Sequence, residues 1–404
     1  IVSARQSYLQ WLFKAIKLPF LPTYNDFQLK YKHRFNAHNE LTILGIGAID
    51  DMSLNTKLQS TGSEVQRYIL SYLPRYKQWN YTVGAVYKHY GAEHTDSWVL
   101  SRNMLRNSSV KHQSNDPTLP KLSEYQSDET ESKLRYERMY TTLPFKLSFG
   151  AGLRYADYRN RAERLAYQSG KVVPLSYDAH IRLLAYSAFA QASDEYFDRR
   201  LKIGLGVNLV GNTLNSVMSN PFPQLSPRLS VSFALTDDID LNANFGRYAM
   251  QPSYTSMGYQ APDGTYPNKI RLRYIMSNQA VLGGEYHLGS YLHFSAEGFY
   301  KSYSSYPISE IEGISLASKG TEYGQVGAEA VLSTGEGRAY GAEVVARLMP
   351  WHQFSAIATY TLFRSEFTDK AGIYRPSSWD TRQMLNLLLS YRLGKLVPLC
   401  LLAL

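Results

Sequence analysis

The feature that most constrains this chain is the alternation of apolar and polar side chains over long segments. Successive side chains of a β-strand point to opposite faces, so alternation predicts strands with one apolar and one polar face. In residues 201–209 the apolar positions are Leu201, Ile203, Leu205, Val207 and Leu209. Phe299 and Leu388 break the pattern, which otherwise repeats in residues 145–156, 229–235, 291–301 and 385–391. The pattern predicts an all-β chain.

The alternating segments are about 10–14 residues long, roughly twice the usual length of a strand in a globular protein. A strand that crosses a bilayer at a tilt needs about 9–11 residues, which fits these lengths. A charged side chain that faces lipid at mid-membrane costs about 2–4 kcal/mol, so charged strand residues should line the lumen of a barrel. The charged residues expected on that inner face are Arg154, Lys202, Arg228, Glu297, Glu343 and Arg347.

Short and long links alternate between the predicted strands. We expect about sixteen strands, near residues 24–35, 41–50, 76–90, 95–105, 129–141, 144–157, 180–192, 200–211, 226–235, 239–249, 276–287, 290–304, 338–348, 353–363 and 380–392, with a first strand within 1–9. Tight turns are expected at 236–238, 288–290 and 349–352, and long links at 249–273 and 305–336. Transmembrane barrels combine short periplasmic turns with long outer loops, so the sequence predicts a transmembrane antiparallel β-barrel. Residues 8–16 form the best helix candidate.

Composition excludes several other classes of protein. No apolar run approaches the roughly 18 residues of a membrane-spanning helix, and Cys400 is the only cysteine, so no disulfide forms within the chain. The net charge of +9 is spread without a basic block, so we expect no nucleic-acid partner. The chain contains 33 tyrosines. Aromatic pairs near strand ends predict an interfacial girdle: Tyr87 and Tyr90, Tyr155 and Tyr158, Tyr300 and Tyr303, and Tyr360 and Phe363.

The sequence contains no motif that indicates catalysis. Gly45-Ile46-Gly47 lacks the rest of a dinucleotide fingerprint, and there is no phosphate-binding loop and no nucleophile elbow. The nine histidines are dispersed, without helical spacing that would place two ligands on one face. We therefore expect no enzyme activity, no cofactor, no metal site and no catalytic residue.

Tyrosines in two long links are the candidates for ligand contact. They are Tyr254, Tyr259, Tyr266 and Tyr274 in one link, and Tyr303, Tyr306 and Tyr323 in the other. Exposed aromatic rings on outer loops could stack on a ligand, because binding residues concentrate on loops. Packing of the loops against one another explains the same residues and is the favoured interpretation, so no ligand-binding residue is assigned.

Several motifs resemble a known family. They occur in the order Ser226-Pro227-Arg228-Leu229-Ser230, Leu241 to Tyr248, Gln251-Pro252-Ser253-Tyr254, Glu297-Gly298-Phe299-Tyr300-Lys301, Gly335 to Glu343, and Trp379 to Asn386. Together they resemble the barrel region of TonB-dependent outer-membrane receptors, particularly those of Bacteroidetes-type bacteria. The resemblance covers residues 1–392.

The resemblance implies a barrel of about 22 strands with an N-terminal plug, which imports a scarce nutrient with energy from the TonB complex. This chain departs from that pattern: it contains no plug, no TonB box and only about sixteen candidate strands. We therefore expect residues 1–392 to be a partial outer-membrane barrel. Residues 393–404 are expected to be an atypical apolar tail without a clear strand, because Pro398 cannot donate to a ladder.

The leading hypothesis is a barrel fragment of a nutrient receptor in the cell outer membrane. The ligand would be a siderophore, a vitamin, haem or a glycan. The partners would be lipid and the TonB complex through a plug absent from this chain, with a surface lipoprotein as a further candidate. The alternatives are a passive porin, an outer-membrane barrel enzyme and a soluble all-β adhesion module. A porin would conduct ions without an energy source, an enzyme would need a nucleophile cluster, and a soluble module would be extracted without detergent.

Overall fold

Strands account for most of the chain, and they form one sheet of 18 strands. The computed structural model describes every residue except 141, 169–170, 320–325, 352, 393–397 and 404. The strands are β1 (Val2–Gln6), β2 (Phe20–Arg34), β3 (Asn39–Leu54), β4 (Arg75–Tyr90), β5 (His94–His112), β6 (Lys121–Tyr140), β7 (Lys146–Gln168), β8 (Lys171–Tyr196), β9 (Leu201–Asn212), β10 (Ser226–Ala234), β11 (Ile239–Met250), β12 (Ile275–Leu288), β13 (Leu292–Ser309), β14 (Val331–Trp351), β15 (Phe354–Thr368), β16 (Tyr374–Pro376), β17 (Arg382–Arg392) and β18 (Pro398–Ala403).

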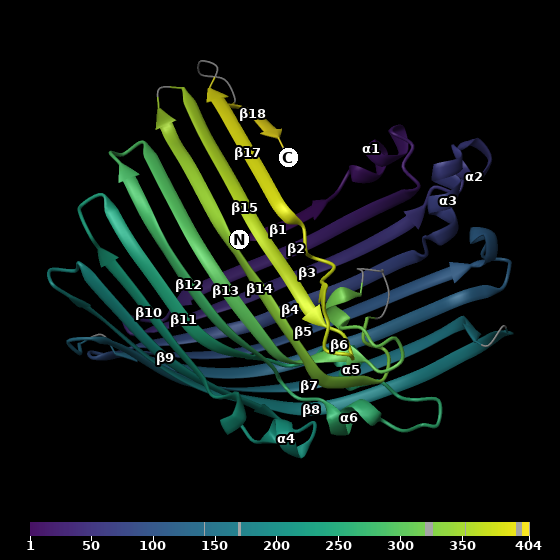
Figure 1. Cartoon of the computed structure of the whole chain (residues 1–404), viewed down its shortest axis with the longest axis horizontal. Helices are drawn as coiled ribbons and strands as arrows, with labels where there is room; N and C mark the ends of the chain where they lie inside the picture. Colours follow the sequence, from purple (N-terminus) through teal and green to yellow (C-terminus); the bar gives the residue numbers. More distant parts are fainter. Residues whose placement is uncertain (141, 169–170, 320–325, 352, 393–397, 404) are drawn as a thin grey trace.

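Each long strand pairs in antiparallel fashion with the next strand in the chain, from β1 to β15 and then through β17 to β18. The short β16 is an extra pairing at the end of β15. Figure 1 shows this sheet as a strongly curved wall. No pairing joins β1 to β18 in the part of the chain that the structure describes. The predicted fold class, a partial antiparallel barrel made only of β-strands, is confirmed.

Long links lie at one end of the wall and short turns at the other, as predicted, except between β7 and β8, which extend until only residues 169 and 170 separate them. The helices and 3-10 turns all lie in the long links (Figure 1): α1 (Leu9–Ala15), α2 (Leu58–Thr61), α3 (Glu64–Tyr72), η1 (Gln113–Asn115), α4 (Ser216–Ser219), η2 (Phe222–Gln224), α5 (Tyr254–Met257), α6 (Pro267–Arg271) and η3 (Leu316–Ser318). The expected helix at 8–16 is α1. Within the described residues, each of these helices is too short or too polar to span a bilayer.

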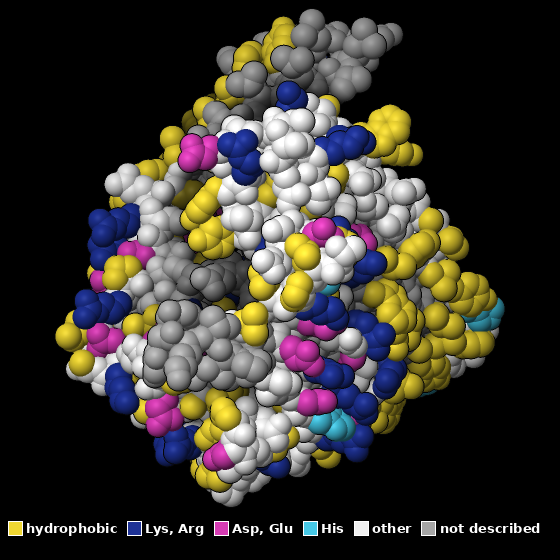
Figure 2. Space-filling model, turned by 90° about the vertical axis from the view of Figure 1, so that its right-hand side faces the viewer, with side chains coloured by type: hydrophobic (Ala, Val, Ile, Leu, Met, Phe, Trp, Pro, Cys, Tyr) yellow, Lys and Arg dark blue, Asp and Glu magenta, His cyan; other side chains and the backbone are white. Residues whose placement is uncertain are grey.

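The two faces of the wall differ as the alternation predicts. Large apolar side chains on the outer face are exposed, including Leu205 at 58% and Leu282 at 57%. Figure 2, which faces the side that carries α1–α3, shows a broad hydrophobic surface beside a zone of interspersed acidic and basic side chains. Exposed apolar area of this extent on a curved sheet is the expected surface of a wall that contacts lipid.

The predicted aromatic girdle is half right. Tyr155 and Tyr300 lie on the outer face and are exposed, but Tyr158 is only 3% exposed and packs on the inner face. Tyr303 also lies on the inner face. It stands opposite Ser277, and the hydroxyl of Tyr303 is partly buried there. The physical reason is the period of two: residues three apart on a strand always point to opposite faces.

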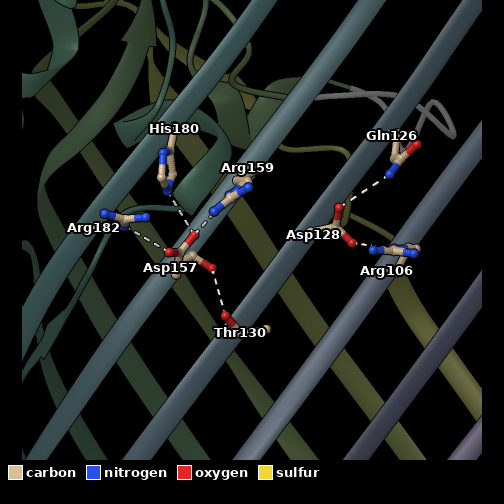
Figure 3. Close-up of polar contacts among 8 residues, drawn as sticks. All are labelled: Arg106, Gln126, Asp128, Thr130, Asp157, Arg159, His180 and Arg182. Atoms are coloured by element: carbon tan, nitrogen blue, oxygen red, sulfur yellow. Dashed lines mark hydrogen bonds and ion pairs between the residues drawn. The ribbon is translucent and has the colours of Figure 1, made fainter.

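Strands β5 to β8 are longer than predicted, and their two faces exchange character beyond Tyr155. Past this point the outer face of β7 carries Asp157 and Arg159, and the inner face carries Ala156 and Tyr158, which are buried. Figure 3 shows the outer charges: Asp157 accepts from His180 Nε2 and Arg182 Nε at 2.9 Å each. A second cluster joins Arg106, Asp128 and Gln126. Charge on the outer face indicates that these strands extend past the lipid into water.

Two predicted boundaries were wrong. The tail contains β18, whose backbone pairs with Leu387–Arg392, although no clear strand was expected there. Pro398 is the first residue of this edge strand, a position where a missing N–H costs no internal ladder bond. The third tight turn was placed too early, because Met349 to Trp351 belong to β14; His352 lies outside the described residues. Gly246 of β11 leaves room for the Tyr248 ring, which lies 2.8 Å from where a Cβ would be.

Candidate functional site

A pocket of about 770 Å³ opens on the inner face of the wall, below the long link between β11 and β12. Strands β6 and β7 supply its charged side chains, and the link itself supplies its cover. The alternation explains why β6 contributes several charged side chains, because every second residue of this strand points to the inner face. The polar lining includes Glu129, Glu131, Lys133, Arg154, Gln251 and Tyr254.

Glu131 is the centre of the polar network in this pocket. Its carboxylate accepts a hydrogen bond from the Tyr254 hydroxyl at 2.6 Å and pairs with Lys133 Nζ at 2.6 Å and Arg154 Nη1 at 3.3 Å. The Glu131 side chain is 7% exposed, whereas the two cations are 43% and 32% exposed. The network therefore presents partly solvated positive charge to the lumen and keeps its negative charge covered.

The β11–β12 link is attached to the wall by a second set of hydrogen bonds. Gln251 Oε1 accepts from Arg154 Nη2 at 2.8 Å and from Asn212 Nδ2 at 3.2 Å. Asn212 also donates to the Tyr274 hydroxyl at 3.1 Å. Burial raises the pKa of Tyr254, and the bond to Glu131 raises it further. Tyr254 therefore stays protonated at neutral pH and remains a donor.

An apolar cluster lies behind the pocket and holds the links together. Its members are Ala156, Tyr158, Ile181, Leu183, Ala185, Leu214, Met218, Tyr254, Met257, Leu272, Tyr274, Met276 and Val331. They come from the extended strands β7 and β8, from the links that carry α4, α5 and α6, and from the first residues of β12 and β14. The inner face of the extended strands is apolar because it packs against these links, which explains the exchange of faces beyond Tyr155.

Asn268 of α6 connects two links inside this cluster. It is fully buried, and its Nδ2 donates to the backbone oxygens of Ser256 at 2.8 Å and Glu329 at 2.7 Å. Its Oδ1 accepts from the backbone N–H of Val331 at 2.9 Å. One side chain thus satisfies three buried backbone groups and fixes the cover of the pocket.

The loop tyrosines are divided between these environments. Tyr254 and Tyr274 are 9% and 5% exposed and belong to the apolar cluster, so at these two positions loop packing, the favoured interpretation, holds. Tyr306 is also partly buried and packs against the ring of Phe367 at 4.5 Å. Tyr259 and Tyr266 are only half-buried, and Tyr323 lies outside the described residues.

The structure brings together residues that the sequence did not connect. Arg154 was expected to line the lumen and does so, but its partners Glu131 and Gln251 were not singled out. A signal was present for Glu129, Glu131 and Lys133, which are charged residues at alternate positions of one predicted strand. No local pattern points to Asn212 or Asn268, because they join segments far apart in the chain: Asn212 lies 39 residues from Gln251, and Asn268 lies 61 residues from Glu329.

Comparison with known families identifies the architecture. A family model described as "TonB dependent receptor-like, beta-barrel" matches residues 20–396. The chain belongs to this family of outer-membrane receptors and transporters. No curated protein matches the chain.

Solved structures of such receptors share the fold. The copper transporter OprC superposes with a TM-score of 0.67 at 12% identity, over 93% of this chain and 58% of that one. The ferripyoverdine receptor of Pseudomonas aeruginosa gives 0.66 at 15% identity, over 93% and 53%. The ferric citrate transporter FecA gives 0.63 at 16% identity, over 93% and 56%. The chain thus spans little more than half the length of these proteins.

Proposed function

We propose that this chain is the barrel part of an outer-membrane receptor that imports a scarce nutrient, with energy delivered by the TonB complex. The observation that carries the proposal is the luminal pocket beneath the long links, in a chain whose family is that of TonB-dependent receptors. The printed names of the similar structures concern copper, ferripyoverdine and ferric citrate, so a metal or metal-chelate ligand is one class to test. The other candidate ligands are a vitamin, haem and a glycan.

The pocket supports a binding role rather than a catalytic one. Its donors toward the lumen are the partly exposed cations of Lys133 and Arg154, because the single hydroxyl hydrogen of Tyr254 is donated to Glu131. Such donors hold the oxygen atoms of a polar or anionic ligand. They provide no nucleophile with an adjacent base, so we propose that the protein is not an enzyme.

The partners follow from the same architecture. The exposed apolar outer face supports contact with outer-membrane lipid. The charged outer side chains beyond Tyr155, such as Asp157 and His180, support a position of the loop end outside the membrane. We propose coupling to the TonB complex through a plug, and a surface lipoprotein is a further candidate partner. The finer assignment to a Bacteroidetes-type receptor rests on the sequence motifs alone.

Uptake by cells that carry the complete gene tests the proposal. Strains with and without the gene would receive labelled ferric siderophores, cobalamin, haem and oligosaccharides, each with the TonB system intact or deleted. We expect accumulation of one ligand that requires both the gene and TonB. Accumulation that persists without TonB, together with ion conductance of the purified protein in planar bilayers, would show a passive porin instead.

Variants of the pocket refine the test. Arg154→Met removes a luminal cation and is expected to weaken uptake, since charge-assisted hydrogen bonds contribute about 1.5–3 kcal/mol. Arg159→Met is the matched control, because Arg159 lies on the outer face beside Asp157. Equal uptake by both variants and the wild type would show that the pocket does not bind the imported ligand.

A further inference from the structure

A second cluster of functional side chains lies at the opposite end of the wall, beside the short turns. Asp240 of β11, Glu285 and His287 of β12, and His293 of β13 are on three adjacent strands. Glu285 stands opposite Asp240, and His287 stands opposite His293. Their register places all four side chains on the inner face, because their strand neighbours Leu241, Tyr286 and Phe294 are the exposed apolar residues of the outer face.

We propose that these residues form a binding site for a divalent transition-metal ion such as Zn²⁺ at the turn end of the lumen. Two imidazoles and one or two carboxylates are a ligand set found in zinc sites of proteins. Imidazole ligands suit zinc, copper and nickel, whereas magnesium and calcium prefer a shell made only of oxygen. The inference does not depend on the ligand or the energy source proposed for import.

The separations between ligand atoms fit one small ion. Four ligands at about 2.0–2.1 Å in a tetrahedron lie about 3.3 Å from one another. His293 Nε2 lies 3.1 Å from Glu285 Oε2, and His287 Nε2 lies 3.9 Å from the same oxygen. His287 Nε2 lies 3.7 Å from Asp240 Oδ2. The ligand atoms of Glu285, His287 and His293 all lie within 4.8 Å of one another, so rotation of these side chains can bring them onto one ion.

The surroundings fix these side chains in place. The backbone N–H of His287 donates to the oxygen of Asp238 at 2.8 Å, which holds the β10–β11 turn beside the cluster. Glu285 Oε1 accepts from Asn242 Nδ2 at 3.0 Å, leaving Oε2 toward the two histidines. The rings of His287 and His293 lie 4.6 Å apart. A hydrogen-bonded carboxylate next to paired imidazoles is the kind of preorganised shell that metal sites use.

The charge balance also favours a cation at this place. Asp237 and Asp238 in the turn add to Asp240 and Glu285. Arg347 of β14 stands opposite His293, but its side chain is exposed and its charge is screened by solvent. A second histidine–carboxylate cluster, on β7 and β8, is different: Asp157 is shared by His180, Arg159 and Arg182, whose two guanidinium groups already neutralise it (Figure 3). That contrast makes His180 a matched control.

Metal binding to the purified full chain, without a histidine tag and in detergent, tests the proposal. The protein would be stripped with EDTA and dialysed, then titrated with Zn²⁺ by equilibrium dialysis and elemental analysis. Co²⁺ would report the geometry through its visible absorption. We expect one Zn²⁺ per chain and an intense cobalt spectrum typical of tetrahedral coordination. We expect His287→Gln and His293→Gln each to weaken Zn²⁺ binding at least about tenfold, and His180→Gln to leave it unchanged.

Asp240→Asn keeps the volume of the side chain, so the fold should be retained. Circular dichroism would monitor the fold of every variant. The Asp240→Asn change is expected to weaken Zn²⁺ binding by about tenfold while leaving the β-sheet signal intact. Either of two results would overturn the proposal: a wild-type chain that takes up no stoichiometric Zn²⁺, or a folded His287→Gln/His293→Gln double variant that binds with wild-type affinity.

Discussion

The loop end and the turn end of the barrel wall are held together by different means. At the loop end, an apolar cluster, the Glu131 network and Asn268 join segments that are far apart in the sequence. At the turn end, links of a few residues connect neighbouring strands, and backbone geometry such as the left-handed Gly289 with φ +57° decides their shape. The comparison indicates that the loop end has a side-chain core of its own. Substitutions in that core should therefore affect the links and leave the strand pairing of the wall unchanged.

Replacement of Asn268 should give the largest effect. Asn268→Ala removes the side-chain partner of three backbone groups, and a buried group left unsatisfied costs about 1–3 kcal/mol. We expect the local stability of residues 251–274 to fall by about 3 kcal/mol or more, measured by hydrogen exchange in micelles. Asn36→Ala at the turn end is the control, since Asn36 is exposed and accepts from the His38 N–H at 2.9 Å. Equal losses in both variants would contradict the comparison.

Removal of the charge at the centre of the pocket should have an intermediate effect. Glu131→Gln keeps the size of the side chain and weakens its bonds with Lys133, Arg154 and Tyr254. Because the two cations are partly solvated, we expect a loss of about 1–2 kcal/mol in protection of α5 from exchange. Glu163→Gln disrupts an exposed pair with Arg161 and should cost no more than about 0.5 kcal/mol. A larger loss in Glu163→Gln than in Glu131→Gln would mean that burial does not determine how much each ion pair contributes to stability.

A backbone change should act at the turn end alone. Gly289→Ala places a side chain at φ +57°, where the Cβ would also lie 3.2 Å from the Tyr291 ring. We expect the β12–β13 hairpin to lose about 1 kcal/mol, read from exchange of its turn amides, with no change in the loops. Gly298→Ala in the middle of β13 has its closest contact at 3.8 Å and should leave those turn amides unchanged. Loosened loops in Gly289→Ala would show that the two ends are coupled.

The smallest expected effect concerns Asp369 in the link between β15 and β16. Hydrogen bonds from the backbone of Ile373, the Arg375 side chain and the backbone of Ala371 lower the pKa of Asp369. A lowered folded pKa means that this stabilisation is complete above the ordinary value of about 3.9 and is lost as the pH falls through the folded pKa. The Ile373 amide proton should therefore shift in an NMR titration with a midpoint below 3.9. Asp369→Asn should abolish the transition, and a midpoint above 3.9 would contradict the assignment.

The fold could be predicted from the sequence because most of its strands have one apolar face and one polar face. All sixteen expected strands overlap observed ones: the strand within 1–9 overlaps β1, and the other fifteen overlap β2 to β15 and β17. The lengths of β7 and β8 could not be predicted, because beyond Tyr155 the extended part packs against links instead of lipid. Alternation continues there with the opposite sense, and nothing local marks the change.

The pocket could be predicted only in part, for a related reason. Arg154 was placed on the inner face by the period of two, and Tyr254 was recognised as a loop aromatic residue. Their common partner Glu131 lies 123 residues from Tyr254. Only the curvature of the sheet and the packing of the β11–β12 link on its inner face bring these segments together. The pair of His287 and His293 illustrates the same point, because the turn between them places side chains six positions apart directly opposite each other.

The pairing of nearly every strand with its successor has a consequence for how such walls evolve. A duplication or deletion of two consecutive strands leaves every other neighbour in place and keeps each connection on its own side of the membrane. A change of one strand would reverse the direction of all that follow. The circumference of the wall can therefore grow or shrink in steps of two strands, and each added pair brings one more link at the loop end.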